Sequence, residues 1–135
     1  MNKQIKTLLL IDDDEITNLF NRIIFKESNI AKKITVYDNA IGAIEMIKLK
    51  IQKKDTLPEL IFLDINMPIM NGWDFLDQIS FLPHSVRDSI KIVMLSASAN
   101  PDDIARSNRY HFVKGYACKP INADKIKTIF QNLEI

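Results

Sequence analysis

The sequence predicts an α/β fold in which helices cover both faces of a five-stranded parallel sheet. Short apolar runs alternate with segments whose apolar residues recur at helical spacing. Some of the runs are apolar at every position, which is typical of strands buried on both faces. The chain has 135 residues, of which 47% are hydrophobic and 26% charged. This length and balance predict one domain with a continuous core.

The first half of the chain contains two strand–helix units. Residues 7–11 form an apolar run that ends at acidic residues, and residues 34–37 form a second predicted strand. After each run, apolar residues recur at spacings of three and four, as on one stripe of an amphipathic helix. Asp38 or Asn39 is placed to cap the second helix. The two stripes consist of Ile16, Leu19, Phe20, Ile23 and Ile24, and of Ala40, Ile44, Ile47 and Ile51.

Three further units follow along the rest of the chain. Residues 60–63, 90–95 and 115–118 predict strands. Asn100 and Pro101 mark a helix start, because asparagine caps helices and proline fits the first helical position. The other two helices carry Phe75, Leu76 and Ile79 after Gly72, and Ile126, Ile129, Phe130 and Leu133 after a possible cap at Asn122.

Composition and charge argue against several classes of protein. A net charge of +1 gives little support to a role in binding nucleic acid, which favours basic domains. Cys118 is the single cysteine, so an internal disulfide is impossible. The apolar run at residues 8–11 is too short for a signal peptide or a membrane span. We therefore expect a cytoplasmic protein with neither nucleic acid nor membrane as a partner.

Chemically useful side chains follow the predicted strands. Asp12, Asp13 and Asp14 follow the first strand, and Asp64, Ser96 and Lys119 follow the third, fourth and fifth. Because parallel strands end at one edge of the sheet, these residues are expected to converge there. Clustered carboxylates repel one another, and a hard divalent cation such as Mg²⁺ relieves the repulsion. Such a site suits phosphoryl transfer.

Each of these residue types fits a step of that reaction. One carboxylate acts as nucleophile and becomes an aspartyl phosphate. The cation and a nearby ammonium stabilise the charge that spreads over the phosphoryl oxygens. A small hydroxyl group donates a hydrogen bond to one of these oxygens. Asp64, Lys119 and Ser96 are the candidates for the nucleophile, the ammonium and the hydroxyl.

At four places the sequence resembles the CheY-like receiver family of two-component response regulators. The match extends over nearly the whole chain, and the block around Asp64 is its most specific part. The matching segments are LIDDD at 10–14, LDINMPIMNG at 63–72, LSA at 95–97 and YACKP at 116–120. The resemblance implies a flavodoxin/CheY-like, doubly wound sheet of order 2-1-3-4-5 with five helices, and a single receiver domain at residues 1–135.

The resemblance also implies a role for each site residue. Asp64 is expected to accept the phosphoryl group, and Asp13 to bind Mg²⁺ directly alongside it. Asp12 would act on the ion mostly through water, and Asn66 would contribute its backbone carbonyl. Lys119 would assist the reaction, with its bond to the following proline cis. Ser96 and Tyr116 would form the switch.

We therefore expect a phosphorelay response regulator that functions as a phosphoprotein. A sensor histidine kinase or a histidine phosphotransfer protein would donate the phosphoryl group, and a downstream protein effector would read the change. The protein would be no enzyme beyond assisting its own phosphorylation and dephosphorylation. Two alternatives remain at this stage: a pseudo-receiver whose switch is unused, and a haloacid-dehalogenase-type phosphatase. The acidic set argues against the first, and Asn66, where that phosphatase needs an acid, argues against the second.

Overall fold

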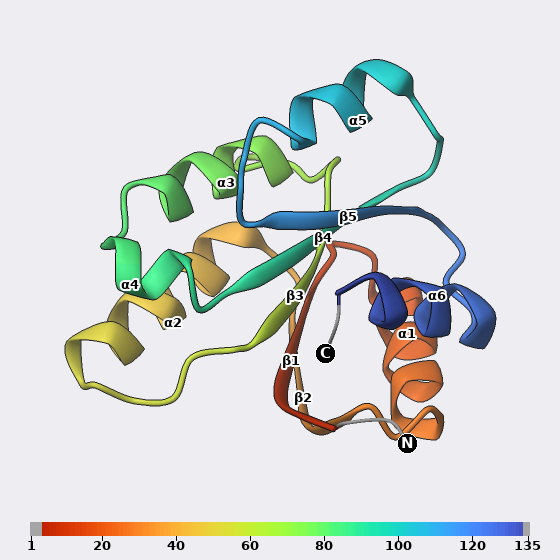
Figure 1. Ribbon diagram of the computed structural model, residues 1–135, viewed down its shortest axis with the longest axis horizontal. Helices are drawn as coiled ribbons and strands as arrows, with labels where there is room; N and C mark the ends of the chain where they lie inside the picture. The colour runs from red at the N-terminus through yellow and green to blue at the C-terminus, as the bar shows by residue number, and fades with distance from the viewer. Residues whose placement is uncertain (1–3, 134–135) are drawn as a thin grey trace.

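A five-stranded parallel sheet forms the centre of the protein in the computed structural model, which describes residues 4–133 (Figure 1). The strand order is β2-β1-β3-β4-β5, which confirms the predicted order. Each pair of neighbouring strands is parallel. The strands are β1 (Ile5–Ile11), β2 (Ala31–Tyr37), β3 (Leu60–Asp64), β4 (Lys91–Ser96) and β5 (Val113–Cys118).

The central strands are buried because they are apolar at nearly every position. All of β3 is buried, whereas the edge strands β2 and β5 are more exposed. Strand pairing places Asp64 beside Leu95, and Ser96 beside Cys118. The carboxyl ends of β3, β4 and β5 therefore meet at one edge of the sheet.

Helices lie on both faces of the sheet, with α1 and α6 on one side and α2 and α3 on the other (Figure 1). Five helices were expected, and the described residues contain an additional one-turn helix, α4. Four residues are too few to show helical periodicity in a sequence. The helices are α1 (Glu15–Glu27), α2 (Ala40–Gln52), α3 (Gly72–Ser80), α4 (His84–Arg87), α5 (Pro101–Ser107) and α6 (Ala123–Leu133).

Side-chain caps begin most of the helices. Asn39 rather than Asp38 caps α2, and its Oδ1 accepts a hydrogen bond from the amide of Gly42. The predicted caps at Asn100 and Asn122 are confirmed, since each accepts a backbone N–H of its helix. Such caps satisfy amide groups that have no partner inside the helix.

Helix α1 differs from the usual amphipathic arrangement, because most of its apolar stripe faces solvent. Of the stripe, only Ile24 packs against the core. The helix instead buries Asn18, whose Nδ2 donates to the carbonyl of Asp12 at 2.7 Å. It also buries Phe25, whose ring lies 4.8 Å from that of Phe62. The exposed members are Ile16, Leu19, Phe20 and Ile23, with exposed fractions of 65%, 59%, 59% and 44%.

Candidate functional site

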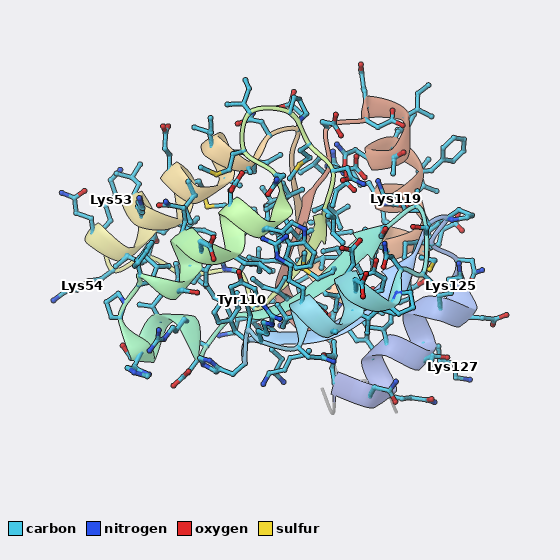
Figure 2. All side chains as sticks on the ribbon, turned by 90° about the horizontal axis from the view of Figure 1, so that it is seen from above. Lys53, Lys54, Tyr110, Lys119, Lys125 and Lys127 are labelled. Carbon is cyan, nitrogen blue, oxygen red and sulfur yellow. The ribbon has the colours of Figure 1, made fainter. Side chains whose placement is uncertain are left out.

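Three carboxylates and one ammonium converge where the strands end, as the sequence predicts. Asp12 and Asp13 follow β1, and Asp64 is the last residue of β3. One carboxylate oxygen from each lies within 4.8 Å of the others. Lys119 follows β5, and its Nζ lies 2.6 Å from Asp12 Oδ2 and 3.1 Å from Asp64 Oδ1. The label of Lys119 marks this region in Figure 2.

The surroundings of Asp64 disfavour its negative charge. Burial raises the pKa of Asp64 to about 6, and the charge of Asp12 acts in the same direction. Lys119 opposes these effects but does not cancel them. Burial acts to lower the pKa of Lys119, yet the adjoining carboxylates of Asp12 and Asp64 outweigh it, so the pKa lies above its usual value. Lys119 is therefore a charged ammonium that compensates part of the acidic charge.

Hydrogen bonds donated by backbone amides fix the segments that carry the site. Asp12 Oδ1 accepts the amide of Asp14 at 3.0 Å, while Asp14 caps α1 by accepting the amide of Ile16 at 3.1 Å. The amide of Lys119 donates to the carbonyl of Ser96 at 2.8 Å. These contacts join the segment after β5 to the end of β4 and hold the segment after β1 in place.

The loop between β3 and α3 folds back onto the end of β3. The amide of Gly72 donates to the carbonyl of Ile65 at 2.8 Å. A Cβ atom at Gly72 would lie only 2.8 Å from the carbonyl oxygen of Asp64, so any larger residue would push the loop away. Asn66 lies in this loop, two residues after Asp64, and is exposed. The loop therefore holds Asn66, two residues after Asp64, near the end of β3.

The two residues predicted to form the switch are linked through Ser98, which the sequence analysis did not single out. Ser96 is buried, and its Oγ accepts the amide of Ser98 at 3.2 Å. Tyr116 lies on the edge strand β5, and its hydroxyl donates to the carbonyl of Ser98 at 3.1 Å. A single residue thus contacts both side chains. Only a loop conformation reveals this link, so sequence spacing does not predict it.

An apolar groove of about 450 Å³ adjoins the acidic site. Helix α1 supplies Ile16, Phe20 and Ile24 to the groove, and the segment after β5 supplies Lys119 and Pro120. Lys119, whose ammonium contacts Asp64, is thus also part of the lining of an apolar groove. The peptide bond between Lys119 and Pro120 is cis, as the resemblance implied.

The site is chemically suited to a divalent metal ion. Its donors are carboxylate oxygens, which hard ions such as Mg²⁺ prefer. Asp12 Oδ2 is buried and accepts no well-aligned hydrogen bond, although the Lys119 ammonium lies beside it. Three carboxylates facing one ammonium leave an excess of negative charge. A divalent cation would neutralise that excess, so the residues present fit such an ion.

The fold and this site define a regulator of the phosphorylation type. Residues 8–131 match the family described as "Response regulator receiver domain". The chain therefore belongs to this family. Receiver domains are typically signalling modules rather than catalysts, and they partner with histidine kinases. None of the helices between residues 4 and 133 has the length and hydropathy needed to cross a bilayer.

Known relatives support the same assignment. Response regulator Rcp1 from Synechocystis sp. is 27% identical over 130 residues, which cover 96% of this chain and 86% of that protein. A two-component response regulator from Cytophaga hutchinsonii gives a TM-score of 0.88 at 28% identity, covering 98% of this chain and all of that chain. The Mn²⁺-bound form of Rcp1 gives a TM-score of 0.71 at 28% identity, covering 92% and 88%.

Proposed function

We propose that this chain is a phosphorelay response regulator that accepts a phosphoryl group on Asp64 in the presence of Mg²⁺. The donor is a phosphohistidine on a sensor histidine kinase or a histidine phosphotransfer protein. The observation that carries the proposal is the convergence of Asp12, Asp13 and Asp64 beside the ammonium of Lys119. We take residues 1–135 to be one receiver domain, which works in the cytoplasm.

Each residue of the site would have its own role in the reaction. Asp13 and Asp64 would hold the ion together with the backbone carbonyl of Asn66, and Asp12 would act through water. When bound, Mg²⁺ supplies charge neutralisation at the phosphoryl oxygens. A carboxylate oxygen of Asp64 attacks phosphorus, the phosphorus–nitrogen bond breaks, and the imidazole of the donor leaves with the electron pair. Lys119, already 3.1 Å from Asp64, stabilises the negative charge on the transferring group.

Ser96 and Tyr116 would convert phosphorylation into a change of shape. The Ser96 hydroxyl would turn toward the new phosphoryl group and donate a hydrogen bond to it. Because Ser96 Oγ now accepts the amide of Ser98, that turn would free Ser98 to move. The hydrogen bond from Tyr116 to the Ser98 carbonyl would then break, and the face made by α5, β5 and α6 would change for an effector protein.

The apolar groove beside Lys119 supports docking of a protein donor at α1. A phosphohistidine must approach Asp64 closely, so its protein necessarily covers the surface around the site. Ile16 and Phe20 are exposed there, and burying them against a partner is favourable. The donor would therefore place an apolar surface on α1 as its imidazole reaches Asp64.

The decisive experiment uses acetyl phosphate as a small donor and mass spectrometry as the readout. With Mg²⁺, the wild type should gain one phosphoryl group, and Asp64→Asn should gain none. Equal labelling of the two proteins would refute the proposal. Absence of labelling in both would favour a pseudo-receiver, and sustained release of phosphate from a generic phosphate ester would favour a phosphatase.

A further inference from the structure

A second lysine, Lys125, holds the backbone on either side of Lys119. Its Nζ donates hydrogen bonds to the carbonyl of Cys118 at 2.9 Å and to the carbonyl of Pro120 at 2.8 Å. The first carbonyl group belongs to the residue before Lys119, and the second belongs to the proline after it. Lys125 therefore binds the segment after β5 from the side of α6. Figure 2 labels Lys119 and Lys125 on the same side of the molecule.

The position of Lys125 in its helix makes this contact notable. Lys125 lies in the first turn of α6, where its amide donates to the cap Asn122 at 2.8 Å. A cation is disfavoured at this end of a helix, because the helix dipole is positive there. Lysine side chains also lose much rotamer freedom when they are fixed in one position. Lys125 is nevertheless half-buried and folds back onto two carbonyl groups, whose partial negative charges act against both costs.

The backbone of Lys119 is thus held from two directions. Its amide donates to the carbonyl of Ser96 at the end of β4, and Lys125 ties the neighbouring carbonyls to α6. The Lys119 side chain must extend from this segment to reach Asp12 and Asp64. A small shift of the segment would carry the ammonium away from the position where phosphoryl charge develops.

We propose that Lys125 is a positioning residue for phosphorylation, which acts by fixing the backbone that places the Lys119 ammonium. This inference rests on the proposed function of Asp64. It assigns no contact between Lys125 and the phosphoryl group. Since the carboxylates lie at the ends of β1 and β3, loss of Lys125 should not weaken Mg²⁺ binding, whereas it should slow phosphoryl transfer.

The test compares Lys125→Met, Lys125→Arg and the control Lys127→Met, an exposed lysine on the same helix. Calorimetry gives the Mg²⁺ dissociation constant, and labelling by acetyl phosphate at saturating Mg²⁺ gives the rate constant. A misplaced catalytic group lowers rates strongly, so we expect Lys125→Met to label about tenfold more slowly, with a Mg²⁺ affinity no weaker than that of the wild type. Lys125→Arg keeps charged donors and should recover most of the rate, and Lys127→Met should match the wild type.

Three results would overturn the positioning role. They are an unchanged rate in Lys125→Met, a parallel loss of Mg²⁺ affinity, and an arginine variant no better than methionine. Thermal unfolding of each variant is measured first, and Lys125→Gln replaces the methionine variant if the latter is unfolded. Failure of the proposed function gives a different result, because the wild type would then label no better than Asp64→Asn.

Discussion

At Asp64, burial and the charge of Asp12 raise the pKa of the carboxyl group to about 6, from an ordinary value of 3.8. Between these two pH values the folded protein binds a proton that the unfolded chain has released. Stability therefore falls as pH rises through this window, and the full cost of the charge is present above the folded pKa. The residue proposed to accept the phosphoryl group thus weakens the metal-free fold.

Removing the negative charge of Asp64 should stabilise the metal-free protein. We expect Asp64→Asn to raise the free energy of unfolding by about 1–3 kcal/mol at pH 7.5, because the pKa shift sets the cost of ionising the group. The gain should shrink steadily toward pH 4. Urea unfolding in a chelating buffer at both pH values measures it. A gain that does not depend on pH would show that the substitution acts through packing instead.

Lys119 should have opposite effects on metal binding and on phosphoryl transfer. In Lys119→Met the methylene stem is largely kept but the charge is lost, so Asp12 and Asp64 lose their cationic neighbour. Mg²⁺ should then bind more tightly, since it replaces the missing positive charge. Labelling by acetyl phosphate should slow by roughly a hundredfold, the order found when one charge-stabilising donor is removed. Calorimetry and labelling separate the two effects, and weaker Mg²⁺ binding would contradict this account.

Among the elements, α1 shows where sequence patterns are insufficient. The spacing of its apolar residues predicts the helix correctly, but periodicity does not identify the face that contacts the core. That choice depends on tertiary contacts, namely Asn18 to the Asp12 carbonyl and Phe25 against Phe62. An exposed apolar stripe beside a partly polar buried face is visible only when the helix is placed on the sheet.

The exposed stripe on α1 should matter for a protein donor and not for a small one. We expect Phe20→Ser to slow phosphoryl transfer from a phosphohistidine protein by roughly tenfold, because truncated interface residues commonly cost more than 1 kcal/mol. Labelling by acetyl phosphate should stay unchanged. Leu49→Ser removes a similarly exposed apolar side chain from α2 and serves as the control. Equal slowing with both donors would place the defect in the site itself.

At the scale of the whole molecule, the sequence predicts which residues converge at the site. It predicts the detailed geometry of their contacts less well. Asp12, Asp64 and Lys119 were expected together because parallel strands end at a common edge, and their contacts confirm it. The strand order came from the resemblance alone, since periodicity carries no information about which strands are neighbours. The link through Ser98 and the Lys125 contacts depend on loop conformations that sequence spacing does not encode.

Metal binding should couple this edge of the sheet to the stability of the entire domain. A ligand that binds only the folded state adds about 2.7 kcal/mol at a hundred times its dissociation constant. At pH 7.5 Mg²⁺ should therefore offset the cost of the crowded carboxylates and raise the unfolding temperature. At pH 5 Asp64 is largely protonated, so the same Mg²⁺ concentration should stabilise far less. Calorimetric unfolding scans at both pH values, with Asp13→Asn as the control, measure the coupling. If Mg²⁺ stabilised the wild type and Asp13→Asn equally at both pH values, the ion would be binding somewhere other than these three carboxylates.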